Sequence, residues 1–93
     1  MYIAVVHQVK DPQAFLSRGE RLDSSNAPPG VVGRQFCPSK DLSAATCVWE
    51  GDSVDAVREY IDSTLGDSSE NTYFEINTEH AQGLPEPPAT EAP

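Results

Sequence analysis

His7 is the side chain in this sequence best suited to chemistry. It is the only side chain in the apolar segment Tyr2–Val9 that titrates near neutral pH. A histidine titrates near neutral pH and can act as a general base, a proton donor or a ligand. A carboxylate beside it, such as that of Glu75, would orient the ring and raise its pKa. The two residues can meet only if segments 2–9 and 71–77 are neighbouring strands. The alternative is a hydrogen-bonded histidine at an interface.

Trp49 and two cysteines are the other residues that could take part in binding or chemistry. Trp49 is the only tryptophan, and it can form a flat apolar wall for an aromatic ligand or bury surface between two subunits. Cys37 and Cys47 are too few for the disulfide framework of a small secreted domain. We expect two reduced, half-buried thiols, although a cross-strand pair stays open. No HxH, CxxC or HxxE spacing is present, so no metal site is predicted.

The order of elements that must position these residues is strand, helix, strand, strand, helix, strand. Asp11 and Pro12 suit the start of a helix that runs to about Leu22. The apolar stripe of the second helix ends before Gly66, a typical stop residue. The strands are expected at 2–9, 31–37, 44–50 and 71–77, and the second helix at about 53–65. This order predicts a ferredoxin-like α+β fold, a four-stranded antiparallel sheet with two helices on one face.

Charge and composition limit the classes of partner that this protein can have. Fifteen acidic against six basic residues give a net charge of −9, which argues against nucleic acid or an anionic membrane as a partner. No apolar run approaches the ~20 residues of a membrane span, and no signal-peptide pattern is present. A cytoplasmic protein is therefore expected. Residues 1–80 form the predicted domain, and the Pro- and Glu-rich residues 81–93 are predicted to be a disordered tail.

Alternation along the strands predicts which side chains face the helices. In segment 71–77, Phe74 and Ile76 are apolar and are expected to pack on the helices. Tyr73, Glu75 and Asn77 then point to the uncovered face of the sheet. In segments 2–9 and 44–50 both alternating sets are mostly apolar. Periodicity therefore leaves the orientation of these two strands open.

Two short motifs give the sequence a resemblance to a known family. Residues 29–33 (PGVVG), followed by 49–57 (WEGDSVDAV), resemble the antibiotic-biosynthesis-monooxygenase type of domain in the dimeric α+β barrel superfamily. The resemblance covers roughly residues 2–77. It implies a homodimer whose two sheets face each other and enclose a pocket. It also implies that His7, Cys47 and Trp49 line that pocket, with Phe36 or Gln35 from the second strand.

The resemblance does not extend to haem chemistry. Relatives that degrade haem bind its iron through a histidine of the second helix, and residues 54–65 contain none. The first strand carries His7 where those relatives have an asparagine. No cofactor is therefore expected.

These observations predict a homodimeric barrel that binds a small apolar or aromatic molecule. The expected pocket lining is His7, Cys47, Trp49, Tyr73, Glu75 and Phe36. One alternative is a cofactor-independent monooxygenase or isomerase acting on an aromatic or quinol-like substrate, with His7 as general base and Glu75 behind it. Another is a structural or interaction domain whose open sheet face is only a dimer interface.

Overall fold

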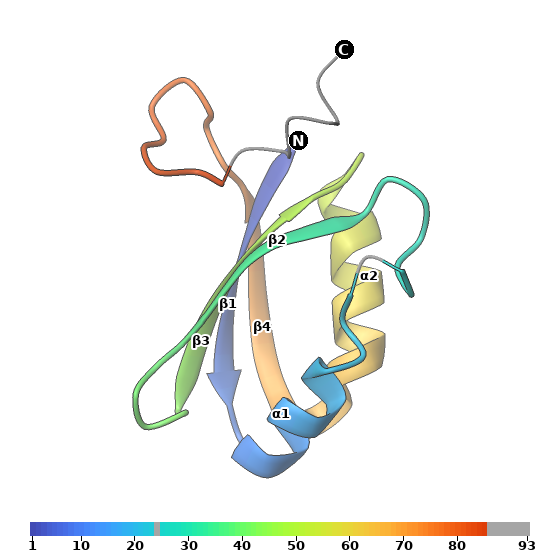
Figure 1. Cartoon of the computed structure of the whole chain (residues 1–93), viewed down its shortest axis with the longest axis vertical. Coiled ribbons are helices and arrows are strands. Elements are labelled where there is room, and N and C mark those ends of the chain that lie inside the picture. The colour runs from blue at the N-terminus through green and yellow to red at the C-terminus, as the bar shows by residue number, and fades with distance from the viewer. Residues whose placement is uncertain (24, 86–93) are drawn as a thin grey trace.

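The computed structural model describes residues 1–23 and 25–85 (Figure 1). Its elements follow the predicted βαββαβ order: β1 Tyr2–Val9, α1 Pro12–Gly19, β2 Val32–Pro38, β3 Ala44–Glu50, α2 Val54–Leu65, a 3-10 turn Gly66–Ser68, and β4 Ser69–Glu75. The predicted ends of the first helix and of the last strand were wrong. The helix stops at Gly19, and the last strand begins two residues earlier than expected. The predicted tail lies largely outside the described residues.

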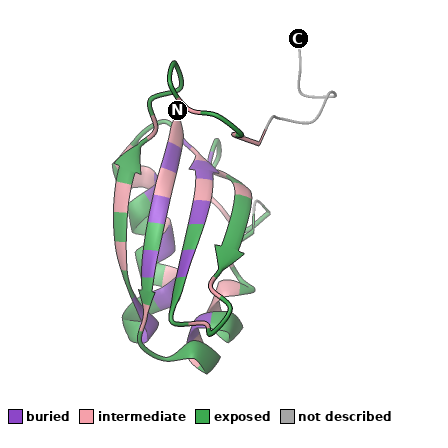
Figure 2. Cartoon of the chain, turned by 90° about the vertical axis from the view of Figure 1, so that its left-hand side faces the viewer, coloured by how far each residue is buried: buried purple, intermediate pink, exposed green. Residues whose placement is uncertain are grey.

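The four strands form one sheet in the order β2-β3-β1-β4, and every neighbouring pair is antiparallel. The two helices lie together on one face, and the other face is open (Figures 1 and 2). This confirms the ferredoxin-like α+β fold. The order also places β1 at the centre, so that a residue on β1 can contact both β3 and β4.

The two helices cover the sheet unequally. Ser53 caps α2 by accepting the Ala56 N–H at 3.1 Å. The apolar stripe of this helix, Val57, Ile61 and Leu65, is completely buried against the sheet. By contrast, α1 has only eight residues, and Phe15 is its one buried side chain. Because α1 is short, it covers little of the sheet near β2.

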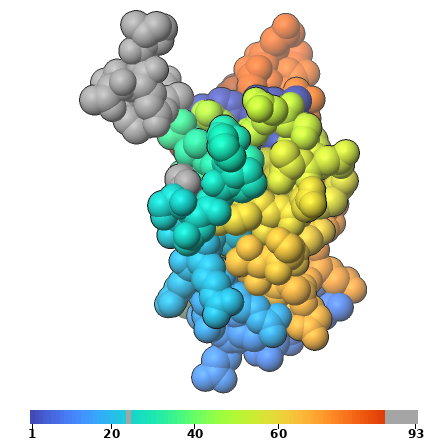
Figure 3. All heavy atoms as spheres, turned by 90° about the vertical axis from the view of Figure 1, so that its right-hand side faces the viewer, coloured from blue at the N-terminus to red at the C-terminus, as the bar shows by residue number. Residues whose placement is uncertain are grey.

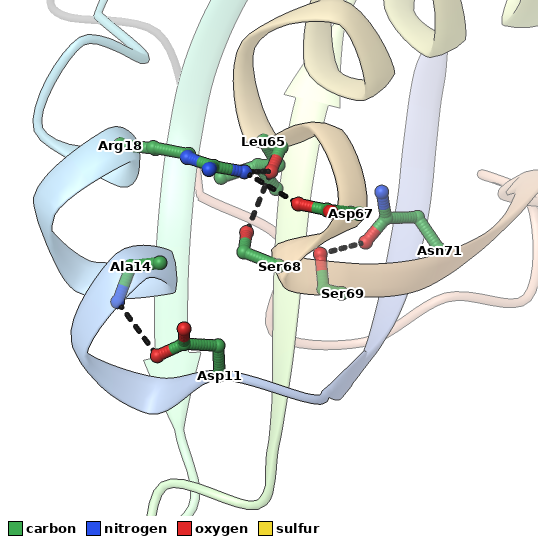
Figure 4. A network of polar contacts seen from close by, with 8 residues as sticks. All are labelled: Asp11, Ala14, Arg18, Leu65, Asp67, Ser68, Ser69 and Asn71. Carbon is green, nitrogen blue, oxygen red and sulfur yellow. Dashed lines mark hydrogen bonds and ion pairs between the residues drawn. The ribbon is translucent and has the colours of Figure 1, made fainter.

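Arg18 connects α1 to the end of α2 through hydrogen bonds. Its Nη1 donates to the Leu65 carbonyl at 2.9 Å and to the Asp67 carboxylate at 3.0 Å (Figure 4). Ser68 donates to the same Leu65 carbonyl at 2.6 Å. The last carbonyls of a helix have no partner within the helix, so these contacts satisfy one of them and hold the two helices together at this end.

The predicted face assignment of β4 was the reverse of the observed one. Tyr73 lies opposite Val5 in the β1–β4 register, and Val5 is completely buried beneath the helices. Phe74 lies opposite Ala4 and is 53% exposed on the open face. The tyrosine faces the helices because its hydroxyl finds a partner there, donating to Asp62 of α2 at 2.5 Å.

A β-bulge in β2 changes which of its side chains faces the helices. Gly33 lies opposite Trp49, and Gln35 lies opposite Val48, so Arg34 is the additional residue between them. Such a bulge shifts the alternation of the strand by one position. Phe36 therefore pairs with Cys47 and shares its face, although simple alternation places it with Val32 on the other one.

Gly51 is required where β3 turns into α2. A Cβ atom built on this buried residue lies 2.8 Å from Cγ2 of Val57, which is closer than real contacts allow. We expect Gly51→Ala to lower the free energy of unfolding by about 1–3 kcal/mol through overpacking. Urea unfolding followed by circular dichroism measures the change.

The control is Gly19→Ala, because nothing lies within 4 Å of a Cβ atom at that position. This variant is expected to unfold at the wild-type urea concentration or slightly above it, since alanine favours a helix more than glycine does. Equal effects of the two substitutions would contradict the packing argument.

Candidate functional site

A cavity of about 660 Å³ lies on the helix side of the sheet, bordered by α1, β2, β3 and the residues that follow α1. Figure 3 shows this side of the molecule, with α1 in light blue, the segment after it in cyan and α2 in yellow. The cavity arises because α1 is too short to cover β2. His7, Cys47 and Trp49 contribute to its lining, and Leu16 and Phe36 lie at its exposed rim.

Aromatic packing shapes the walls of this cavity. The Trp49 ring lies edge-on to Tyr60, with centroids 5.8 Å apart. Gly33 passes over the same ring, where a Cβ atom would lie 3.2 Å from Cη2. The Tyr60 hydroxyl donates to the carbonyls of Arg21 and Asp23 at 3.1 and 3.2 Å. The chain after α1 is thereby held beside the cavity.

Three strands bring together a cysteine, a histidine and an asparagine. The Nε2 atom of His7 lies 3.0 Å from the Cys47 Sγ, and its Nδ1 atom lies 2.6 Å from the Asn71 Oδ1. His7 and Asn71 are directly opposite in the β1–β4 register. An amide oxygen can only accept, so Nδ1 carries the proton and Nε2 accepts from the thiol.

Asn71 is itself held in one orientation. Its Oδ1 also accepts from the Ser69 hydroxyl at 2.8 Å (Figure 4). Its Nδ2 donates to the Asp62 carboxylate at 2.9 Å, and the Tyr73 hydroxyl donates to the same carboxylate oxygen. The amide cannot rotate without losing its own bonds to His7, Ser69 and Asp62. A chain of hydrogen bonds thus runs from Cys47 through His7 and Asn71 to Asp62.

Burial keeps both reactive groups uncharged. It lowers the pKa of His7 below its usual value, against the opposing effects of the Asn71 hydrogen bond and of the Asp62 charge. It raises the pKa of the Cys47 thiol to about 12. A neutral imidazole beside a neutral thiol is therefore the resting state near pH 7, as the S–H···N hydrogen bond requires. Burial also raises the pKa of Tyr73, and the Asp62 carboxylate raises it further.

The structure brings together some of the predicted site residues but not on the predicted face. His7, Cys47, Trp49 and Phe36 all border the cavity. They lie on the helix side, so their predicted position inside a pocket between two facing sheets was wrong. Both alternating sets of β1 and β3 are mostly apolar, so only the family resemblance indicated a face for these side chains.

The predicted contact between His7 and Glu75 was also wrong. Glu75 lies opposite Ile3, four residues along β1 from His7 and therefore about 13 Å away. Asn71 occupies the place that was expected for the carboxylate. Tyr73 faces the helices but contacts Asp62 rather than the cavity. Asn71 was missed because only the strand register brings it to His7. Asp62 of α2 was missed because it is linked to His7 only through Asn71.

The two cysteines are both free thiols, and they lie on opposite faces of the sheet. Cys47 is buried on the helix side, whereas Cys37 is exposed and pairs with Thr46, whose neighbours in β3 face the helices. In the part of the chain that the structure describes, no three His, Cys, Asp or Glu side chains gather as metal ligands would. Within residues 1–23 and 25–85, neither helix has both the length and the apolar character needed to cross a bilayer.

Comparison with known proteins gives no further guide to the site. A scan against protein-family models found no match, and searches of curated proteins and of solved structures found no similar chain.

Proposed function

We propose that this domain binds a small apolar or aromatic molecule in the cavity between α1 and β2. The observation that carries the proposal is a cavity with exposed apolar side chains at its opening and a buried tryptophan in its wall. Leu16 and Phe36 are 40% and 51% exposed at the rim, and Trp49 is buried below them. The volume of about 660 Å³ lies within the range of about 300–1,000 Å³ that is usual for ligand pockets.

The polar groups at the floor favour an uncharged ligand. His7 and Cys47 are neutral at rest and bonded to each other. Glu20, Asp23 and Arg34 also border the cavity, but a charged group that reached His7 and Cys47 would lose its hydration without gaining a partner of opposite charge there. Apolar surface, in contrast, gains about 25 cal/mol for each Å² removed from water. We therefore expect shape and hydrophobicity, rather than charge, to determine affinity.

Two phenylalanines with similar exposure on opposite faces of the sheet, Phe36 and Phe74, allow a matched test of binding in the cavity. The neutral aromatic dye N-phenyl-1-naphthylamine is titrated into the wild type and its fluorescence is followed. Phe36→Glu puts a carboxylate at the rim, and we expect it to weaken binding at least about tenfold, equivalent to about 1.4 kcal/mol. Phe74→Glu makes the same change on the open face, where Phe74 is 53% exposed, and should bind as the wild type does. No binding by the wild type, or equal losses in both variants, would overturn the proposal.

We further propose that the open face of the sheet pairs with a second copy of this chain. Val6 of β1 and Phe74 of β4 are 44% and 53% exposed on this face, and both helices lie on the other one (Figure 2). Large apolar side chains gathered on one exposed face are typical of an interface. The family resemblance, which implies two facing sheets, supports a second copy as the partner. The protein is then a homodimer whose two ligand cavities lie outside the shared interface.

The same two variants test this pairing by light scattering on a sizing column. The wild type and Phe36→Glu are expected at twice the chain mass of 10.1 kDa, and Phe74→Glu at the chain mass itself. A wild-type monomer at 100 μM would reject the dimer and leave the cavity proposal unaffected. A dimer that binds no dye would instead favour a purely structural or interaction domain.

The alternative of a cofactor-independent monooxygenase or isomerase has weaker support. A neutral histidine at the floor of an apolar cavity is suited to take a proton from a phenol. However, the basic nitrogen of His7, Nε2, is directed at the Cys47 Sγ at 3.0 Å. The nearest proton to that nitrogen belongs to the thiol rather than to a bound molecule.

A further inference from the structure

We propose that Cys47 is a nucleophile that adds to small apolar α,β-unsaturated carbonyl compounds in the cavity, with His7 as its base and Asn71 as a positioning residue. The proposal rests on the proposed function, because the compound must first enter the cavity between α1 and β2. It goes beyond that function by assigning a covalent step to the residues at the cavity floor.

The geometry is that of a nucleophile, its base and a group that orients the base. The Cys47 Sγ lies 3.0 Å from Nε2 of His7, and Nδ1 of His7 lies 2.6 Å from Oδ1 of Asn71. An activated thiol needs a base within hydrogen-bond reach and a third group that fixes the base. The three side chains come from β3, β1 and β4, so the paired strands of the sheet hold them in place.

The position of the thiol favours a soft, uncharged electrophile. Cys47 is only 6% exposed and borders the cavity together with Trp49 and Phe36. Most of the cavity lining is apolar, so we expect charged thiol reagents and large ones to react slowly with Cys47. The chain carries a net charge of −9, which disfavours the approach of phosphorylated or carboxylated electrophiles. An enone or enal of modest size has the reactive carbon, the apolar body and the neutrality that the cavity requires.

The addition step balances without an oxidant or a second substrate. The thiol proton of Cys47 moves to Nε2 of His7, and the sulfur electron pair forms a bond to the β-carbon. The C=C π electrons move toward the carbonyl and give an enolate. Nε2 then returns the proton to the α-carbon, and a thioether is left. The transient imidazolium donates from Nδ1 to Asn71, and the Asp62 carboxylate behind Asn71 favours this positive charge.

The experiment uses the full chain with Cys37→Ser, so that Cys47 is the only remaining thiol. Benzylideneacetone is added at pH 7.5, and adducts are counted by intact-protein mass spectrometry and located by peptide mapping. We expect one adduct, on Cys47. In the same background His7→Gln is expected to slow addition by about 10²–10⁴-fold, the usual contribution of a general base. An unmodified Cys47, or an unchanged rate in His7→Gln, would overturn the proposal.

Asn71 is tested through the pH profile of the rate, which a merely structural role would not move. Asn71→Ala removes the acceptor of the Nδ1 proton and is expected to shift the pH at which the rate reaches half its maximum. An identical profile in Asn71→Ala and the wild type would remove the positioning role. Circular dichroism confirms that each variant is folded.

Dye binding separates failure of this step from failure of the cavity. If N-phenyl-1-naphthylamine binds while Cys47 stays unmodified, only the covalent step is rejected. If the dye does not bind either, the proposed function fails as well. Phe36→Glu gives a further check that leaves His7 in place, so the result does not depend on whether a His7 variant folds. It blocks the rim and is expected to reduce both dye binding and addition to Cys47.

Discussion

Replacing Ile61 by alanine is expected to lower the free energy of unfolding by about 2–5 kcal/mol. Ile61 is completely buried in the middle of the α2 stripe, between Val57 and Leu65. The lost methyl and methylene groups leave a cavity that the rigid sheet below cannot fill. A chain of 93 residues has a total stability of roughly 5–14 kcal/mol, so this one substitution removes a large part of it. Urea unfolding followed by circular dichroism measures the change.

The matched control for this experiment is Ile61→Val, which removes one methylene group at the same position. It is expected to cost about 0.5–1.5 kcal/mol. The two midpoints should therefore be clearly separated. If the alanine and valine variants unfold at the same urea concentration, α2 relaxes onto the sheet and fills the cavity. The apolar stripe of α2 would then not be the main apolar contact of the fold.

The second large effect concerns pH and is expected to depend on His7. Burial lowers the pKa of His7 in the folded chain below the value of 6.5 for an unperturbed histidine. The unfolded chain therefore binds more protons between these two pKa values, and stability must rise with pH in that window. The contribution is fully present above pH 6.5 and is lost as the pH falls toward the folded pKa. We expect a continuous decrease of the urea midpoint from pH 7.5 to pH 5.

His7→Gln is expected to remove most of this decrease, because an amide does not titrate. His80→Gln is the control, since His80 is exposed, and should keep it. The carboxylates whose pKa values are lowered by hydrogen bonds or ion pairs, such as Asp41 and Asp67, lose their contribution only at lower pH. A decrease above pH 5 that persists in His7→Gln would show that another group is responsible.

The order of the elements could be predicted from composition, but the orientation of the strands could not. β1 and β3 were predicted with their observed ends, because apolar and β-branched residues fill both segments. Because apolar residues fill both alternating sets of positions, these strands carry no periodic signal that shows which side is buried. In β4 the two alternating sets were separated correctly, but the wrong set was assigned to the helices. A phenylalanine is the expected core residue, but Asp62 provides the half-buried Tyr73 with a partner for its hydroxyl.

The candidate site depends on register, which a single sequence hardly reveals. His7 could be identified as a candidate because it is a titratable side chain among apolar neighbours. Cys47 and Trp49 could be identified because of their residue types. Asn71 had no such signal, since an asparagine at the predicted start of a strand is ordinarily a turn residue. Its pairing opposite His7 follows from the 3-10 turn Gly66–Ser68, which starts β4 two residues earlier than expected. A contact between residues 64 positions apart becomes visible only when the strands are aligned.

The bulge at Arg34 determines whether a phenyl ring or a thiol of β2 faces the helices. Removing Arg34 would leave Phe36 opposite Cys47, because every pair after the bulge keeps its partner. Pairing the full-length strand without the bulge would instead place Phe36 opposite Thr46 and Cys37 opposite Ala45. The rim of the cavity would then lose its phenyl ring and gain a second sulfur on the side of Cys47. Loss of the bulge at constant strand length is thus a route from a ligand pocket to a dithiol site while the βαββαβ fold stays the same.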